Sequence, residues 1–164
     1  LYSWNSAARD VFLQLAPERD TVPLELNRSE LFARDNHHSE AMVYGYLPLM
    51  TSAQCVHANT EKCDRKRGIL YLKDRYGKYF PVKNNCTECY NIIYNTTPLM
   101  LFGYGKELQK ADFSSFRLNF TVESEEEVRQ ILAIYETVFY EGRKNLADVY
   151  QGEYTNGHYK RGVE

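Results

Sequence analysis

The first fifty residues alternate short apolar runs with stretches of helical period. Three segments are rich in apolar residues, as strands are: residues 1–4, the run TVPLEL at 21–26 and the run EAMVYGYLPLM at 40–50. Between them, apolar residues recur at 8, 11, 12 and 15, which lie on one face of a helix. The segment NRSELFARD at 27–35 starts with Asn27 and has Glu30 three residues later, a capping-box pattern. This order predicts parallel strands joined by helical crossovers.

The pattern changes between about residues 51 and 95. Two strands are expected near 69–73 and 78–82, joined by the polar DRYG at 74–77, in which Gly77 can adopt a positive φ. The run CYNIIYN at 89–95 predicts another short strand. We interpret residues 51–95 as an insertion of β-hairpin character.

The earlier pattern returns after residue 95. The run FRLNFTV at 116–122 predicts a strand, and residues 124–142 predict the clearest helix of the chain. Ser124 and Glu127 form a capping box, and Gly142 ends the helix. One face of this helix is an apolar stripe of Val128, Ile131, Leu132, Tyr135, Val138 and Phe139, which indicates core packing.

Together these segments predict an α/β fold, with a partial TIM-barrel-like parallel β/α unit formed by residues 1–50 and 96–164 and a cysteine-rich β insertion at 51–95. The alternation supplies only about four barrel-type strands, against the eight of a closed barrel. The chain also opens directly on strand-like residues. We therefore expect a piece of a longer polypeptide, whose missing N-terminal part, or a second copy of the chain, covers the exposed sheet edge.

Charge and hydropathy narrow the function classes. The formal net charge of −2 gives no support to a nucleic-acid footprint spread over the whole surface. Neither an apolar run long enough to cross a bilayer nor a leader-like stretch stands in these residues. We expect a cytoplasmic protein that does not enter a membrane.

All four cysteines lie between residues 55 and 89, with the spacing C-x7-C-x22-C-x2-C. Two disulfides would require an oxidising compartment. Four buried structural thiols are a second interpretation, although Cys86 and Cys89 stand among Asn, Thr and Glu. The third, which we favour, is a metal or cluster site formed by Cys55, Cys63, Cys86 and Cys89, because a C-x2-C turn brings two sulfurs into one small volume.

The spacing leaves the identity of the metal open. An iron–sulfur cluster of the [4Fe–4S] type tolerates irregular spacing, whereas structural zinc sites usually show two tight knuckles. His57 lies between the first two cysteines and could replace one ligand, although a solvated or hydrogen-bonded histidine is the simpler interpretation. His37 and His38 are adjacent, so on an extended chain they point to opposite faces and shared ligation is disfavoured.

Several of these stretches together resemble peptidase family U32, the collagenase-like peptidases. EAMVYGYLPLMTSAQC at 40–55 resembles the family signature, in which a strand with Glu is followed by an aromatic residue, Gly and a loop reaching a cysteine. NSAARDVFLQLAPERDTVPLELNRSEL at 5–31 is similar to the preceding family segment, and LKDRYGKYFPVKNNC at 72–86 to its hairpin. YTNGHYKRGVE at 154–164 resembles the glycine–histidine segment that closes its main domain.

The resemblance implies a TIM-barrel-like region and, as in several relatives, four cysteines that hold an iron–sulfur cluster. Cys55 matches a family cysteine, whereas Pro48 stands where many relatives have an earlier one. Members are called collagen-degrading peptidases, and others serve in oxygen-independent hydroxylation of RNA bases or of a quinone precursor. The implied function is that of a peptidase, a hydrolase, or of a cluster-dependent modifying enzyme, with peptide or RNA as substrate. A metal-stabilised interaction module without catalysis is the non-enzyme alternative.

The residues themselves do not favour proteolysis, since neither G-x-S-x-G nor H-E-x-x-H occurs. A barrel enzyme builds its site at the carboxyl ends of its strands. The expected strand ends carry Asn5, Asn27, Tyr44 and Glu123. Asn5 and Asn27 are also good N-caps, and Glu123 also suits the start of a helix.

Glu25 is the strongest catalytic candidate. A carboxylate inside the apolar run VPLEL costs free energy when it is buried without a partner. Arg117 and Arg161 are the basic partners that we expect for it near the substrate. His158 could transfer a proton near neutral pH, although a hydrogen-bonded structural histidine is the simpler interpretation.

Overall fold

The computed structural model describes residues 3–15, 17–60, 65 and 68–162. Its strands are β1 (Asp20–Thr21), β2 (Ser39–Gly45), β3 (Pro48–Ser52), β4 (Ile69–Lys73), β5 (Tyr79–Asn85), β6 (Tyr90–Tyr94), β7 (Leu99–Met100) and β8 (Ser115–Asn119). Its α-helices are α1 (Ser6–Leu13), α2 (Arg28–Ala33), α3 (Val56–Thr60), α4 (Gly105–Leu108), α5 (Glu125–Ile134) and α6 (Leu146–Val149). Two 3-10 turns, η1 (Phe102–Tyr104) and η2 (Gln109–Ala111), and a π-helical segment, η3 (Tyr135–Tyr140), complete the elements.

Strand β2 is the centre of the first sheet, and all seven of its residues are buried. β8 runs parallel to it along one edge, from Glu40 opposite Ser115 to Gly45 opposite Asn119. β1 pairs with the start of the other edge in parallel orientation, and β7 pairs with its end in antiparallel orientation. Both edges of the buried strand therefore find backbone hydrogen-bond partners, as a strand without access to water requires.

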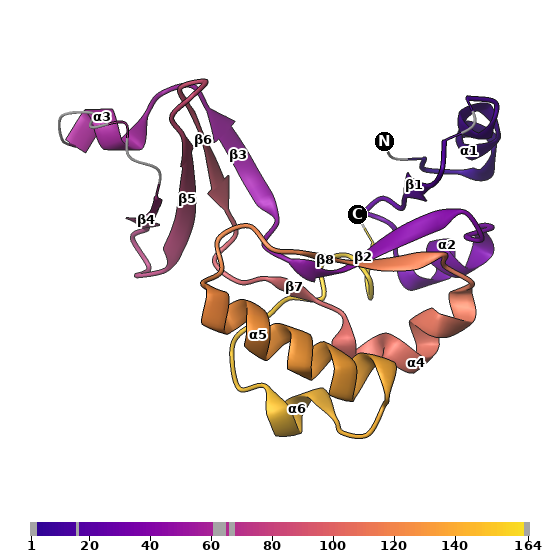
Figure 1. The fold of residues 1–164 in the computed structure, drawn as a ribbon. Coiled ribbons are helices and arrows are strands. Elements are labelled where there is room, and N and C mark those ends of the chain that lie inside the picture. Colours follow the sequence, from indigo (N-terminus) through magenta and orange to yellow (C-terminus); the bar gives the residue numbers. More distant parts are fainter. Residues whose placement is uncertain (1–2, 16, 61–64, 66–67, 163–164) are drawn as a thin grey trace.

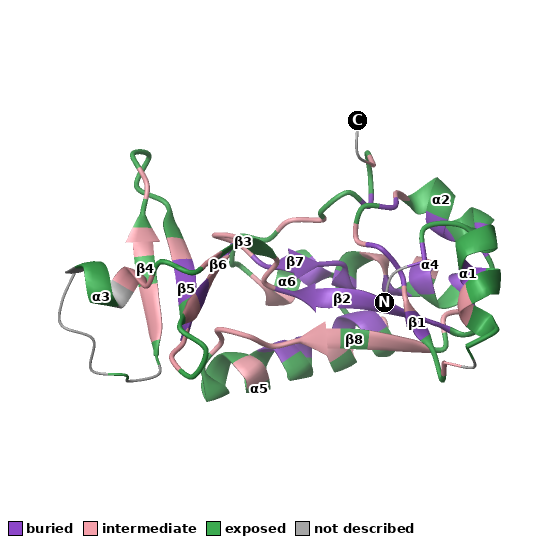
Figure 2. Ribbon diagram, turned by 90° about the horizontal axis from the view of Figure 1, so that it is seen from above, coloured by how far each residue is buried: buried purple, intermediate pink, exposed green. Residues whose placement is uncertain are grey.

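The second sheet is wholly antiparallel, in the order β3-β6-β5-β4. It stands apart from the helices that cover the first sheet, and only β3 leads directly into it from β2 (Figure 1). Its large buried apolar residues are Val82 and Tyr94, and neither belongs to the main core cluster. Figure 2 shows the resulting contrast between the buried β2 and the largely open strand β4.

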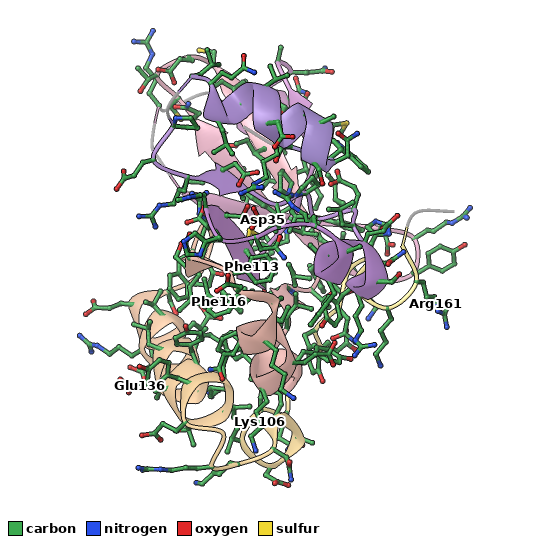
Figure 3. All side chains as sticks on the ribbon, turned by 90° about the vertical axis from the view of Figure 1, so that its right-hand side faces the viewer. Asp35, Lys106, Phe113, Phe116, Glu136 and Arg161 are labelled. Atoms are coloured by element: carbon green, nitrogen blue, oxygen red, sulfur yellow. The ribbon has the colours of Figure 1, made fainter. Side chains whose placement is uncertain are left out.

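The helix α5 with its π-helical continuation η3 covers the first sheet. Ile131, Val138 and Phe139 of the predicted stripe are buried, whereas Leu132 is exposed. Ile134, outside the predicted stripe, is buried as well. The Phe139 ring packs on the rings of Phe102, Phe116 and Tyr135, with centroids 4.8–6.2 Å apart. Phe116 and its neighbour Phe113, whose rings lie 5.9 Å apart, are placed between the strands and the helices (Figure 3).

The predicted partial TIM-barrel-like unit is wrong. The chain forms a mixed α/β domain, in which β7 runs antiparallel to β2 in the first sheet and every pair of the second sheet is antiparallel. The run at 40–50 is not one strand but two, β2 and β3, which separate after Gly45 and enter different sheets. The run TVPLEL contributes only Thr21 to a two-residue strand, because Pro23 cannot donate a ladder hydrogen bond and a turn follows at Leu24–Glu25.

Two further expectations for the N-terminal region also fail. Ser3 and Trp4 are not in a strand, and residues 1–2 lie outside the described part of the chain. The expected apolar face near α1 is not buried, since Val11 is 61% and Leu15 75% exposed. Arg9 is the buried residue of α1 instead, and its Nη1 lies 2.7 Å from Asp35 Oδ2.

The local predictions are confirmed. Asn27 and Ser124 form capping boxes with Glu30 and Glu127, and Asn5 caps α1 by accepting from the backbone N–H of Ala8. The hairpin strands are β4 and β5, and the turn between them has Gly77 at φ 81°. Gly142 follows the end of η3 at φ 62°. No helix within the described residues is long and apolar enough to cross a bilayer.

The close approach of α4 to η3 generates a stability prediction. A Cβ on Gly105 would lie 2.6 Å from the Phe139 carbonyl oxygen, whereas a Cβ on Gly103 would meet nothing within 4 Å. Because the obstructing atom is backbone, we expect Gly105→Ala to lower the free energy of unfolding by about 1–3 kcal/mol. Gly103→Ala is the matched control, with no comparable loss, and both are measured by urea unfolding. Equal effects of the two substitutions would contradict the tight contact.

The buried ion pair between Asp20 and Arg34 generates a pH prediction. Asp20 Oδ2 lies 2.9 Å from Arg34 Nη2, and the carboxylate also accepts from the hydroxyls of Ser3 and Ser39. Burial raises the pKa of Asp20, but hydrogen bonds from Ser3, Ser39 and Arg34 outweigh it, so the pKa is lowered. A lowered folded-state pKa gives stability that is present above the unfolded-state pKa and is lost as pH falls through the folded-state value.

Asp20→Asn should therefore lower the free energy of unfolding near neutral pH by about 3–5 kcal/mol, because it leaves Arg34 buried without its charge partner. Its stability should also change less than that of the wild type as the pH falls below about 4. Urea unfolding between neutral and acidic pH measures both effects. Asp10→Asn, on the exposed side of α1, is the control that should follow the wild-type curve.

Candidate functional site

The second sheet gathers distant parts of the chain at one of its ends. Ser52, the last residue of β3, is paired with Asn91 at the start of β6. Ile69, the first residue of β4, is paired with Lys83 near the end of β5. The end of β3, the start of β4 and the turn between β5 and β6 therefore lie at the same end of the sheet, where Cys55, Cys86 and Cys89 are found.

The C-x2-C pair is the turn between β5 and β6. Residues 86–89 form this turn, and Cys89 adopts a left-handed conformation with φ 55°. Non-glycine residues rarely adopt this conformation. The Cys89 Sγ lies 3.9 Å from the Cys86 carbonyl oxygen, so the turn folds the second thiol back over the first residue.

Three cysteines line one pocket of about 130 Å³ at this end of the sheet. Cys55 reaches it from the segment after β3, and Cys86 and Cys89 reach it from the turn. Cys63, the fourth expected ligand, and the side chain of His57 lie outside the described part of the chain. The other lining residues are Ala58, Arg65, Asn84, Asn85, Tyr90 and Asn91.

The pocket contains three of the four predicted cysteine ligands. Among the described residues, no three His, Cys, Asp or Glu side chains are arranged as a group that could hold a metal ion. The thiols of Cys55, Cys86 and Cys89 share a pocket, but they do not close around one point as they stand. Convergence of all four sulfurs within about 7 Å, the separation that a shared metal or cluster requires, stays a prediction.

Two buried asparagines form another wall of the cysteine pocket. Asn84 and Asn91 are paired across β5 and β6 and are 7% and 1% exposed. Asn91 Nδ2 donates to the carbonyl oxygens of Ser52, at 3.3 Å, and Gln54, at 2.8 Å. The amide of Asn91 thereby positions the segment that leads to Cys55. The Oδ1 atoms of both asparagines are buried and have no hydrogen-bond partner among the described residues, so each can accept from a further donor.

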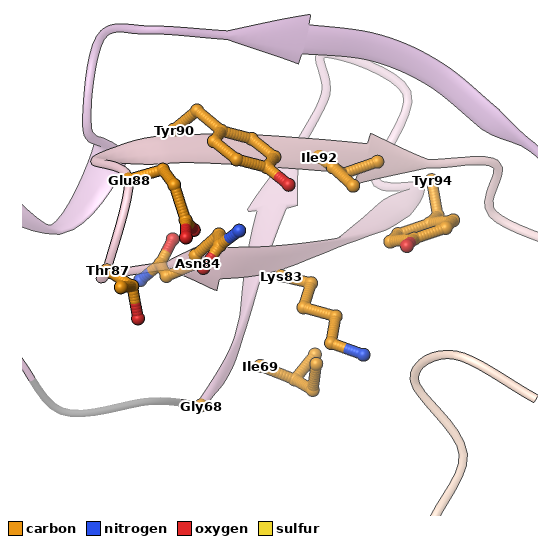
Figure 4. Close-up of a pocket in the computed structure, with 10 residues that line it drawn as sticks. Gly68, Ile69, Lys83, Asn84, Thr87, Glu88, Tyr90, Ile92 and Tyr94 are labelled. Carbon is orange, nitrogen blue, oxygen red and sulfur yellow. The ribbon is translucent and has the colours of Figure 1, made fainter.

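A larger pocket of about 670 Å³ adjoins the cysteine pocket (Figure 4). Asn84, Asn85 and Tyr90 line both. The remaining lining residues of the larger pocket are Gly68, Ile69, Lys83, Thr87, Glu88, Ile92 and Tyr94. Its volume is within the range of small-molecule sites.

A buried tyrosine and carboxylate lie at the carboxyl ends of β2 and β8, where the two sheets meet. Burial, followed by the nearby charge of Glu123, raises the pKa of Tyr44 well above its ordinary value. Glu123 Oε2 accepts from the backbone N–H groups of Thr121, at 2.6 Å, and Val122, at 2.9 Å. Its Oε1 is buried and has no well-formed hydrogen bond within the part of the chain that the structure describes. Lys83 donates to the Thr121 carbonyl oxygen at 3.1 Å and so connects this cluster to the second sheet.

The structure does not bring the predicted catalytic residues together. Glu25 is exposed in a turn, so the argument that it is a buried strand carboxylate is wrong. Arg117 pairs with Glu40 at 2.6 Å and not with Glu25. Arg161 is exposed and lies at the periphery of the molecule (Figure 3). His158 is also exposed, and its Nδ1 lies 2.9 Å from the Gly162 carbonyl oxygen. This contact agrees with the simpler interpretation of His158 as a hydrogen-bonded structural histidine.

The predicted substrate-binding residues likewise have structural surroundings. Asn5 and Asn27 are N-caps. Tyr44 is 2% exposed and packs in the core against Phe102 and Phe120. None of these side chains lines the cysteine pocket or the larger pocket.

Sequence reasoning missed the asparagines and the strand residues that line the two pockets. The only signal was the adjacency of KNN to the C-x2-C pair at 83–89.

Comparisons of the chain with protein-family models, curated proteins and solved structures find no match. Membership of peptidase family U32 therefore stays a prediction from the quoted residues.

The role of Asn91 gives a prediction about Cys55. Asn91→Ala removes both hydrogen bonds to the segment that follows from β3, at a cost of about 1–3 kcal/mol. We expect alkylation of Cys55 under native conditions to become several-fold faster, as followed by peptide mass spectrometry. Asn59→Ala, on exposed α3, is the control. An unchanged Cys55 rate in Asn91→Ala would show that this amide does not position the thiol.

Proposed function

We propose that this chain carries a cysteine-ligated metal centre, with Cys55, Cys63, Cys86 and Cys89 as ligands, in a protein of the U32 type. The observation that supports this is the shared pocket of Cys55, Cys86 and Cys89, which come from segments more than thirty residues apart along the chain. A [4Fe–4S] cluster is the favoured occupant and zinc the alternative. An iron–sulfur cluster supplies electron transfer, whereas a closed zinc site supplies structural stabilisation.

The pocket residues suit thiolate ligands. Arg65 lines the pocket, and its positive charge complements the negative charge of a thiolate-ligated metal centre. The turn conformation at Cys89 holds two thiols in one short loop. The buried amides of Asn84 and Asn91 add polar groups beside the ligands, and such neighbours orient ligands and tune a metal centre.

The cysteines also bear on the class of reaction. If all four are ligands, none is available as a nucleophile, which favours a cluster-dependent modifying enzyme over cysteine-based proteolysis. The family's nominal activity, that of a collagenase-like peptidase, is the alternative by resemblance. Peptide or RNA is the proposed substrate, and the reducing cytoplasm is the proposed compartment, since thiols persist there.

A purely structural metal is a second candidate, and one observation favours it. The second sheet has few buried apolar residues beyond Val82 and Tyr94. A small sheet with little core gains stability from a metal that binds only its folded form. In that case the cysteines fold this sheet for an interaction with a partner, and a second copy of the chain is the proposed partner.

The metal proposal is tested by purification and reconstitution without oxygen. We expect iron and sulfide in a ratio near that of a [4Fe–4S] cluster, with visible absorbance, or else one colourless zinc per chain. Cys55→Ser, Cys63→Ser, Cys86→Ser and Cys89→Ser should each lose most of the metal. Glu88→Gln changes the same turn without removing a thiol and should retain it. A wild-type chain that binds neither metal, or Cys86→Ser and Cys89→Ser variants that bind normally, would overturn the proposal.

A further inference from the structure

The larger pocket has an apolar floor and two charged side chains, those of Lys83 and Glu88. Tyr90, Ile92 and Tyr94 lie on one face of β6, and Ile69 extends this face from β4. Lys83, on β5, is opposite Ile92 in the register of the sheet. Glu88 belongs to the turn beyond the Asn85–Tyr90 pair, at the cysteine end. Figure 4 shows Lys83 and Glu88 at separate places along the row of Tyr90 and Ile92.

The two charges are free for a ligand. Lys83 is exposed, makes one hydrogen bond, to the Thr121 carbonyl oxygen, and has no ion-pair partner in the part of the chain that the structure describes. Glu88 is also exposed and forms no ion pair with any described residue. An ammonium group presents donors and no acceptor, so it suits a carboxylate or phosphate. A carboxylate is an acceptor and suits an ammonium group, an amide N–H or a hydroxyl.

The floor between the charges indicates the body of the ligand. Aromatic side chains pack well on flat rings, and Ile69 and Ile92 supply further apolar contact. The pocket is too large for an inorganic anion alone, and its size suits a small organic molecule. The end of the larger pocket that contains Glu88 adjoins the cysteine pocket at Asn85 and Tyr90. The end of a bound molecule that contacts Glu88 would therefore also reach the cysteine pocket.

We propose that this pocket binds a small organic oxyanion with a flat apolar body and a hydrogen-bond donor at its far end. Lys83 holds the oxyanion, the floor of Tyr90 and Ile92 holds the body, and Glu88 accepts from the donor. The inference rests on the proposed function only in placing this ligand beside a metal centre. The binding itself requires no metal.

The binding test uses four simple probes, measured by isothermal titration on the full chain. 4-(Aminomethyl)benzoate carries both charged ends, benzoate lacks the ammonium group, benzylamine lacks the carboxylate, and phenyl phosphate replaces the carboxylate with phosphate. We expect 4-(aminomethyl)benzoate to bind most tightly of the first three and benzylamine most weakly. Whichever of benzoate and phenyl phosphate binds more tightly assigns the oxyanion as carboxylate or phosphate, and both outcomes support the site.

Substitutions then assign the two ends. Lys83→Met should weaken benzoate binding about tenfold, the effect of one lost charge-assisted hydrogen bond, and should leave benzylamine unchanged. Glu88→Gln should remove the advantage of 4-(aminomethyl)benzoate over benzoate. Lys110→Met, an exposed lysine beside α4, is the control and should bind every probe as the wild type does. No binding of any probe at millimolar concentration, or a benzoate affinity that Lys83→Met does not change, would overturn the inference.

The metal-centre proposal and the ligand-pocket proposal can be tested independently of each other. Cys86→Ser and Cys89→Ser should lose metal while they keep the probe preference, because these thiols line only the smaller pocket. A chain that binds the probes as described and no metal overturns the metal centre alone. A chain that binds metal and shows no charge-dependent probe binding overturns the ligand pocket alone.

Discussion

Complete burial of β2 is the constraint on which the rest of the structure depends. A buried strand must pair both of its edges, because its backbone N–H and C=O groups have no water to bind. The chain meets this need with β8 along one edge and with β1 and β7 along the other. To supply β8, residues from 101 to 114 cross beneath the sheet through η1, α4 and η2, and these turns bring Phe102 against Phe139 of the covering helix. The core therefore forms around one strand and the segments that complete it.

The same strand directs the chain into the second sheet. β2 ends at Gly45 and β3 starts at Pro48, so the second sheet begins where the buried core stops. The cluster of Tyr44 and Glu123 lies at this junction, and Lys83 reaches it from β5 through the Thr121 carbonyl oxygen. The exposed second sheet is thus connected to the core both covalently and through a hydrogen bond.

Two pockets with different chemistry share one wall at the cysteine end of the second sheet. The smaller is lined by thiols, an arginine and two buried amides, and the larger by tyrosines, isoleucines and the charged side chains of Lys83 and Glu88. The shared wall consists of Asn84, Asn85 and Tyr90, at the ends of β5 and β6 beside the turn. A ligand in the larger pocket would therefore lie next to a metal centre in the smaller one. This arrangement suits a reaction between a bound molecule and a redox centre, and it equally suits a metal that stiffens a ligand-binding sheet.

Local interactions were predictable from the sequence by itself. The N-caps at Asn5, Asn27 and Ser124, the hairpin turn at Gly77 and the helix end at Gly142 each depend on residues within about four positions, and all were predicted correctly. Grouping of cysteines was also predictable in part, since their confinement to one window limits how far apart they can lie. The arrangement of the strands in sheets was not predictable, because an apolar run such as 40–50 has the same composition whether it forms one strand or two strands in different sheets. Only tertiary structure decided that Glu25 is exposed and that Asn84 and Asn91 are buried beside the cysteines, because burial depends on which distant segment pairs with each strand.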